Sequence, residues 1–109
     1  MSSPVHFRLG QLSFTWDRAK AEANAAKHGI TFEEAATTWL DPFALERFDE
    51  EHSDAEDRWL RIASSLRGPL LVVWSADAET EGQIVIRIIG AWRASRRERD
   101  WYEKQGKIR

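Results

Sequence analysis

The sequence predicts an α+β domain with two N-terminal helices, an antiparallel sheet of about four strands and a C-terminal helix. Residues 17–42 carry two helix-start signals in succession, and a third lies at residues 95–98. Between them, apolar runs alternate with short polar loops, which favours strands paired mainly antiparallel. The 109 residues, 42% of them hydrophobic, fit a single domain over 1–109, and we expect residues 1–11 to be flexible.

The first helix is expected after a short opening strand at residues 11–16, in which apolar and polar residues alternate. Asp17 is a suitable N-cap, and Gly29 a suitable left-handed C-cap. Helical spacing places three alanines on one face: Ala19, Ala23 and Ala26.

The second helix begins at a capping box formed by Thr31 and Glu34, and Pro42 ends it. Its apolar stripe is expected to be buried: Phe32, Ala35, Ala36 and Trp39. Strands are expected at residues 43–49, 58–65, 70–76 and 83–92, with a polar acidic loop at 49–57 and a hairpin connection at 77–82.

The last helix begins at a second capping box, Ser95 with Glu98. We expect Trp101 to anchor it on the sheet and its charged residues to pair at i,i+4 spacing, as in Arg96 with Asp100.

Charge is distributed unevenly along the chain, whose formal net charge is −2. Residues 32–57 contain ten acidic residues and one arginine, whereas residues 87–109 carry a local net charge of +5. This asymmetry indicates a basic surface patch that suits a nucleic-acid partner, although a merely solvated charged surface is an equal alternative.

Several classes of protein find no support in the sequence. Cysteine is absent, and neither a signal-peptide core nor a membrane-length apolar run is present, so we expect a cytoplasmic protein without membrane contact. The three histidines lack metal-ligand spacing, and no nucleotide-binding glycine motif occurs, so no cofactor is expected. Trp92 and Trp101 flank the basic segment and suit either base stacking or, more simply, packing.

Arg87 lies within the aliphatic run "IVIRII", where a charge is costly unless it is paired or faces a solvated groove. Strict alternation along the strand places Arg87 and Arg93 on one face of the sheet. The alternative is that Arg87 pairs with an acid such as Asp41 or Glu34.

On the first helix a polar stripe lies beside the alanines: Lys20, Asn24, Lys27 and His28. Its lysines suit contact with phosphate. His28 suits acid–base catalysis, because an imidazole exchanges protons near neutral pH; the alternative is that it only helps to cap the helix.

Two segments, "FTWDRAKAEANAAKHGITFEEA" and "RIIGAWRASRRERDWYE", together resemble the BrnT toxins of bacterial type II toxin–antitoxin systems, over about residues 12–104. The resemblance implies a RelE-like fold and an endoribonuclease that stops translation. Because the histidines lack metal-ligand spacing, we expect the 2′-hydroxyl of the RNA to attack the adjacent phosphate without a metal. The resemblance also implies a BrnA-like antitoxin with a ribbon-helix-helix part, in a heterotetramer of two toxins and two antitoxins that binds operator DNA only through the antitoxin.

By position, the resemblance implies these catalytic residues: Lys20, His28, Arg58, Arg87 and Arg93. Four further cations are expected to guide the RNA backbone: Lys27, Arg61, Arg96 and Arg97. Gly90 and Trp92 depart from the family pattern, which has Ser and Arg there, so activity is expected to be weakened. Alternatives are a non-catalytic nucleic-acid-binding module and a partner-binding module that use the same basic face.

Overall fold

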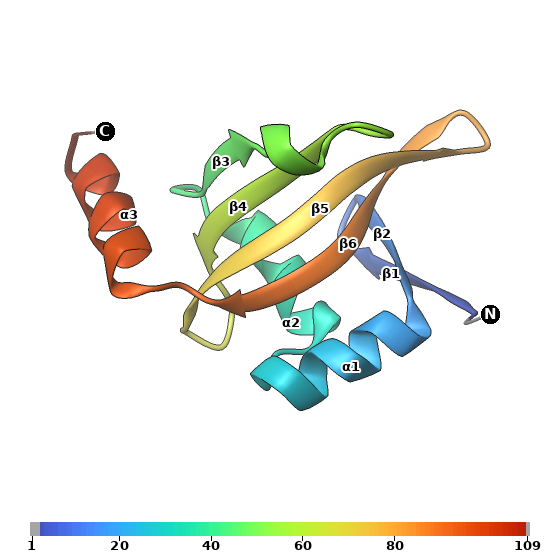
Figure 1. Cartoon of the computed structure of the whole chain (residues 1–109), viewed down its shortest axis with the longest axis horizontal. Helices are drawn as coiled ribbons and strands as arrows, with labels where there is room; N and C mark the ends of the chain where they lie inside the picture. Colours follow the sequence, from blue (N-terminus) through green and yellow to red (C-terminus); the bar gives the residue numbers. More distant parts are fainter. Residues whose placement is uncertain (1–2, 109) are drawn as a thin grey trace.

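The computed structural model describes residues 3–108, with side chains through residue 105, and within these residues it contains three α-helices and a six-stranded mixed sheet (Figure 1). The helices are α1 (Arg18–His28), α2 (Phe32–Ala36) and α3 (Arg96–Ile108), with 3-10 turns η1 (Thr37–Leu40) and η2 (Glu50–His52). The strands are β1 (Pro4–Leu9), β2 (Leu12–Asp17), β3 (Leu45–Phe48), β4 (Arg58–Ser64), β5 (Leu70–Thr80) and β6 (Gln83–Arg93). The α+β class is confirmed.

The sheet is larger than the predicted four strands, and its spatial order is β1-β2-β6-β5-β4-β3. It is not purely antiparallel, because β2 pairs with β6 in parallel at Phe14–Ile86 and Thr15–Arg87. β1 occupies part of the segment 1–11 that was expected to be flexible, and it pairs with β2 along its whole length. Residues 1 and 2, to which that expectation also applies, lie outside the described residues.

Local signals at the helix ends are confirmed. The Asp17 carboxylate accepts a hydrogen bond from the Lys20 N–H at 3.0 Å, and Gly29 ends α1 with a φ of 71°. Ser95 and Glu98 form both hydrogen bonds of the capping box. Thr31 caps α2, but after Ala36 the chain continues as η1 rather than as the longer α-helix expected.

The main core lies between the sheet and the α1–α2 layer, which covers one face (Figure 1). The expected stripe of α2 is confirmed, with Phe32, Ala35 and Ala36 buried and Trp39 partly buried. The three alanines expected to share a face of α1 do so, and that face is exposed. The half-buried side of α1 instead consists of Ala21, Asn24, Ala25 and His28.

Asn24 explains the orientation of α1. Its side-chain amide donates to the Ala91 carbonyl at 2.8 Å and to the Ile30 carbonyl at 3.0 Å, and its oxygen accepts from the Ala91 N–H at 3.1 Å. The side chain thus pairs with both backbone groups of one residue of β6, as a neighbouring strand would. The C-terminal half of α1 is thereby fixed beside the last part of β6.

A β-bulge in β6 changes which side chains share a face. Trp74 of β5 pairs with Gly90 and Ser75 pairs with Ile88, so Ile89 is an extra residue without a partner in β5. Ile88 and Ala91 consequently both face the main core. The prediction that Arg87 and Arg93 lie on one face is wrong, because the extra residue reverses the alternation between them.

The hairpin between β5 and β6 is shorter than the expected connection at residues 77–82. β5 continues to Thr80 and β6 begins at Gln83, so only two residues lie between the strands. Glu81 and Gly82 make the turn with φ of 52° and 78°, as a two-residue type I′ turn requires.

On the opposite face of the sheet, α3 packs against a smaller cluster that contains Ile62, Leu70 and Val72. The predicted anchor, Trp101, is 40% exposed. Tyr102 anchors α3 instead: it packs on the cluster, and its hydroxyl donates to Asp41 at 2.6 Å. The expected pairs along α3, such as Arg96–Asp100, are not among the ion pairs of the described residues.

None of the described helices is long and apolar enough to cross a membrane.

We expect Asn24→Ala to lower the free energy of unfolding by about 2–3 kcal/mol, since it leaves the Ala91 backbone groups without partners. Urea denaturation measures this change. Lys27→Ala, an exposed position on the same helix, is the control and should change stability by less than about 0.5 kcal/mol. Equal stability of the two variants would contradict the role of Asn24.

We expect Tyr102→Phe to lower the free energy of unfolding by about 1–2 kcal/mol at neutral pH. Burial raises the pKa of the Asp41 carboxyl, but hydrogen bonds from the Tyr102 hydroxyl and from backbone N–H groups outweigh it and hold that pKa below 3.8. Because the folded pKa is depressed, this stabilisation is present above the pKa of an unfolded aspartate, about 3.9, and is lost as the pH falls through the folded value.

Urea titrations at neutral pH and below about pH 4 therefore should show the difference between wild type and Tyr102→Phe narrowing in acid. Trp101→Phe, one residue earlier, is the control. A difference that stays constant with pH would contradict the role of Asp41.

Candidate functional site

Two arginines meet on the face of the sheet opposite α1 and α2. Arg58 of β4 and Arg87 of β6 both pair in register with Ala76 of β5, so only one small residue separates them. The Glu56 carboxylate contacts both guanidinium groups, Arg58 at 3.2 Å and Arg87 in a close ion pair. The side chains of this arginine bridge (Arg58, Glu56 and Arg87) are 27%, 31% and 39% exposed, so solvent reaches all three.

Beside the arginine bridge lies a histidine held by an acid. The Nδ1 atom of His52 is 2.9 Å from a carboxylate oxygen of Asp49, whose side chain is only 11% exposed. A proton on Nδ1, shared with Asp49, leaves Nε2 as the nitrogen that exchanges protons with a substrate. The centres of the His52 and Trp74 rings lie 5.5 Å apart in a T-shaped arrangement, and the Arg58 guanidinium lies 4.8 Å from the centre of the same indole.

A second tryptophan extends this row of rings toward α1. The His28 ring lies 6.1 Å from Trp92, because Asn24 holds α1 at this part of β6. Gly90 lies under both indoles: a Cβ atom there would be 3.2 Å from Trp92 Cζ3 and 3.8 Å from Trp74 Cε3. His28, Trp92, Trp74 and His52 therefore form one aromatic row across β6 and β5.

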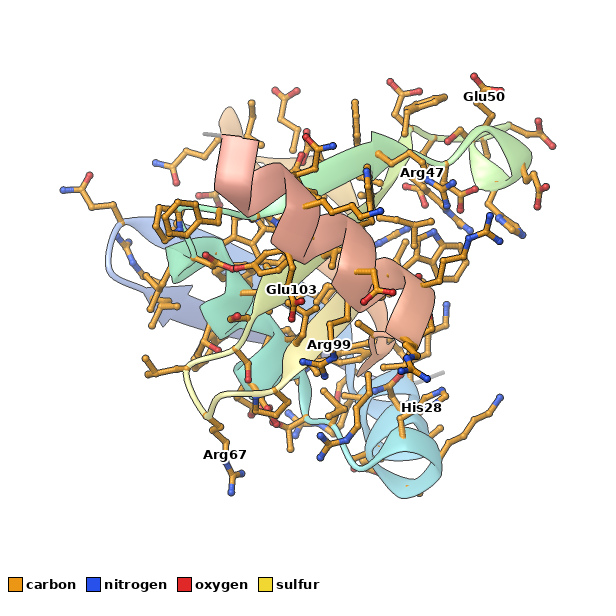
Figure 2. All side chains as sticks on the ribbon, turned by 90° about the vertical axis from the view of Figure 1, so that its left-hand side faces the viewer. His28, Arg47, Glu50, Arg67, Arg99 and Glu103 are labelled. Atoms are coloured by element: carbon orange, nitrogen blue, oxygen red, sulfur yellow. The ribbon has the colours of Figure 1, made fainter. Side chains whose placement is uncertain are left out.

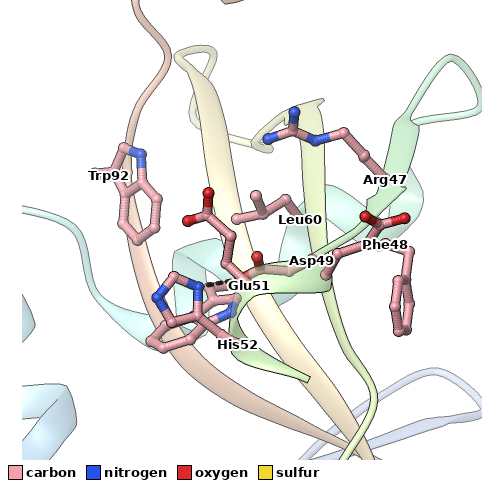
Figure 3. A pocket seen from close by; sticks show the side chains of 9 residues that line it. Arg47, Phe48, Asp49, Glu51, His52, Leu60 and Trp92 are labelled. Carbon is pink, nitrogen blue, oxygen red and sulfur yellow. Dashed lines mark hydrogen bonds and ion pairs between the residues drawn. The ribbon is translucent and has the colours of Figure 1, made fainter. Parts of the chain in front are cut away.

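The acidic loop around η2 encloses a cavity of about 640 Å³ against this row (Figure 3). Trp92 forms one wall, Leu60 and Trp74 line the sheet side, and His52 and Arg47 complete the enclosure. The Glu51 carboxylate points into the space beside Trp92 (Figure 3). We call this space the loop cavity.

The predicted site residues separate into two groups. Arg58, Arg87 and His28 reach the face that carries the loop cavity. Lys20 and Lys27 are exposed on α1, and Arg96 and Arg97 are exposed on the first turn of α3. Arg97 also lines a second cavity, with Trp101, between α3 and the sheet. In Figure 2 α3 lies across the front of the sheet, with Arg47 above it and His28 beyond its lower end.

Arg93 and Arg61 lie on the opposite face. Arg93 pairs in register with Leu71, a residue of the main core, and is exposed there. Arg61 stacks on Trp39 at 4.3 Å and pairs with Glu46, and its side chain is 12% exposed. Burial lowers the pKa of the Arg61 guanidinium, against the opposing effect of Glu46. The structure therefore corrects both assignments: Arg93 does not join Arg87, and Arg61 packs inside the fold.

Arg87 is paired, as the alternative interpretation of the sequence allowed, but its partner is Glu56 rather than Asp41 or Glu34. Glu34 instead accepts from the Ser65 hydroxyl at 2.9 Å, and Asp41 binds Tyr102. Asp49, His52 and Glu56 lie in a segment whose polar, acidic composition predicts only a loop, so the sequence does not identify them as site residues. Its acidic composition beside a strand rich in cations was the available signal, but no local rule shows which loop residue reaches Arg87.

The arrangement has elements that suit phosphate chemistry. Two adjacent guanidinium groups suit the oxygens of a phosphate, and an imidazole fixed by a carboxylate suits proton transfer. Among the described residues, no three His, Asp or Glu side chains are placed to hold a metal ion.

The fold and the site define a small α+β protein whose sheet presents paired arginines and two histidines around an aromatic cavity. The chain belongs to the BrnT family: the family model described as the ribonuclease toxin BrnT of type II toxin–antitoxin systems matches residues 16–98. A search of curated proteins finds no match. The resemblance inferred from the two sequence segments is thereby confirmed.

We expect Glu56→Gln to increase the affinity of the site for inorganic phosphate about tenfold, because the carboxylate that competes for Arg58 and Arg87 is removed. The measurement is the rise in melting temperature as phosphate is added. Glu50→Gln, an exposed carboxylate in the same loop, should leave the phosphate response at the wild-type level. The same response in both variants would show that Glu56 does not compete with anions.

Proposed function

We propose that this protein is a toxin that cleaves RNA without a metal ion and so inhibits translation. The family match supports a ribonuclease toxin, and the observation that carries the chemistry is the arginine bridge on an open sheet face. Arg58 and Arg87 converge on one carboxylate, and the phosphate of an RNA backbone takes the place of that carboxylate when substrate binds.

RNA carries its own nucleophile. The 2′-hydroxyl attacks the adjacent phosphorus as a base removes its proton, and the bond to the 5′-oxygen breaks as an acid protonates that oxygen. The products are a 2′,3′-cyclic phosphate and a free 5′-hydroxyl. Between these states the phosphate oxygens carry additional negative charge, and cations already in place are the strongest means of stabilising it.

Arg58 and Arg87 bind this phosphate in the proposed mechanism. His52, oriented by Asp49, and His28, on the far side of Trp92, are the candidate base and acid. Lys20 is exposed on α1, which covers the other face of the sheet, and is therefore left out of the phosphate site; Lys27, Arg96 and Arg97 attract the RNA backbone in a salt-dependent manner. Arg61 and Arg93 have no part in it, because they lie on the other face.

The partner we propose is a BrnA-like antitoxin with a ribbon-helix-helix part, because a type II system inhibits its toxin with a protein. Two toxins and two antitoxins form the proposed complex, which meets operator DNA only through the antitoxin. We further propose that residues 1–109 act as one domain and that the complex works in the cytoplasm.

A non-catalytic RNA-binding module is the second candidate. The observation that favours it is Trp92, an apolar ring beside the site where the family pattern that the sequence resembles has an arginine. Saturable binding of RNA without cleavage, by protein free of antitoxin, would support this alternative.

We expect purified protein to cleave RNA in the presence of EDTA, and Arg87→Ala to reduce the rate about 10²–10³-fold through loss of one phosphate-binding cation. The matched control is Arg93→Ala, which removes the same side chain from the same strand but on the other face. It should retain activity within about threefold once its wild-type melting temperature is verified.

Two results would contradict the scheme. Equal cleavage by Arg87→Ala and wild type would remove Arg87 from the mechanism. Strict dependence of cleavage on an added metal would refute the metal-free reaction.

A further inference from the structure

We infer that the loop cavity binds one unpaired nucleobase of the RNA, with guanine preferred, next to the phosphate held by Arg58 and Arg87. This inference rests on the proposed RNA substrate and adds a specificity pocket to it. The cavity, of about 640 Å³, has the size and the mixed apolar and polar lining of a small-molecule site.

Trp92 provides the stacking surface. It lines the cavity and is only partly buried. Trp74 is already occupied, with the Arg58 guanidinium over the indole and the His52 ring packed against it in a T-shaped arrangement. Unpaired bases stack on aromatic side chains independently of sequence, so Trp92 supplies affinity for a base but no choice among bases.

The negative charge around the cavity favours a neutral base inside it and keeps the phosphate outside. Asp49, Glu50 and Glu51 line the cavity, so a phosphate entering it would meet carboxylates. Asp49 is already bonded to His52, whereas Glu51 is exposed and points into the space beside Trp92 (Figure 3). A carboxylate only accepts hydrogen bonds, so the cavity favours a base that offers N–H donors.

Guanine offers the best match to such a carboxylate. Its ring N–H and its exocyclic amino group lie side by side on the Watson–Crick edge, and two carboxylate oxygens accept both at once. Uracil presents one N–H between two carbonyl oxygens, which the same carboxylate repels. Stacking on Trp92 and pairing with Glu51 therefore select guanine over uracil.

The position of Trp74 connects this pocket to the reaction. One side of its indole carries Arg58, which belongs to the arginine bridge, and the indole also lines the loop cavity. A base in the cavity thus leaves its own backbone beside Arg58 and Arg87. The pocket reads the nucleotide adjacent to the bound phosphate.

The probes are two labelled hexanucleotides that are 2′-O-methylated throughout, which removes the nucleophile and prevents cleavage. One is all uracil and the other contains a single guanine. Fluorescence anisotropy should show that wild type binds the guanine probe about tenfold more tightly than the uracil probe. Trp92→Leu should weaken binding of the guanine probe about tenfold or more.

Trp101→Leu is the matched control, because it removes an indole that is 40% exposed on α3, outside the loop cavity, and it should bind both probes within twofold of wild type. Glu51→Gln, at an exposed position that should not disturb folding, tests the selectivity separately. It should abolish the preference for guanine, by weakening binding of the guanine probe and strengthening binding of the uracil probe that the carboxylate repels.

Cleavage of ordinary RNA by wild type, measured in parallel, separates the two proposals. Active wild type with unchanged probe binding in Trp92→Leu, or with an unchanged guanine preference in Glu51→Gln, overturns the pocket and leaves the ribonuclease intact. Wild type that neither binds nor cleaves any RNA overturns the proposed function, and the pocket with it.

Discussion

The extra residue in β6 determines the chemistry of both faces of the sheet. If β6 alternated regularly through Ile89, Arg87 would lie on the same side as Ala91 and Arg93, toward the layer of helices. Because Ile89 instead forms a bulge, Ala91 packs in the core while Arg87 and Trp92 share the other face. Bulges commonly occur where a sheet re-aims a side chain beside a functional site, and this one brings a guanidinium and an indole to the same surface.

The same region of β6 also orients α1. Past its short pairing with β2, the strand has an open edge, whose unpaired backbone groups need partners. Asn24 satisfies both groups of Ala91, and since α1 is rigid, His28 one turn later comes to lie against Trp92. A single amide thus serves as a strand partner and as the positioning element for a histidine of the candidate site.

Features governed by neighbouring residues could be predicted from the sequence. Asp17, Gly29 and the Ser95–Glu98 box lie where they were expected, because a cap satisfies backbone groups within one turn. The apolar stripe of α2 was also correct.

Features governed by distant residues could not be predicted. Helical spacing places three alanines of α1 on one face, but it does not show which side of α1 is buried, because that depends on the long-range contact of Asn24 with Ala91. No residue type around Ile88 and Ile89 marks the bulge, so regular alternation predicts the wrong face for Arg93. The loop at residues 49–57 has no periodicity that would show that its acids turn back over the sheet.

Gly90 and Trp92, the two departures from the family pattern, are neighbours in space. A Cβ atom at position 90 would lie 3.2 Å from the Trp92 ring, so the indole would have to shift by a few tenths of an ångström to admit a side chain there. An arginine at 92 would add a third cation beside Arg58 and Arg87, whereas the indole adds an apolar face.

For binding, that exchange is nearly even, since a stacked base and a charged hydrogen bond are each worth about 1–3 kcal/mol. For catalysis it is not even, because an indole stabilises no charge that develops on the phosphate. In the proposed ribonuclease, Trp92 therefore favours holding RNA over cleaving it.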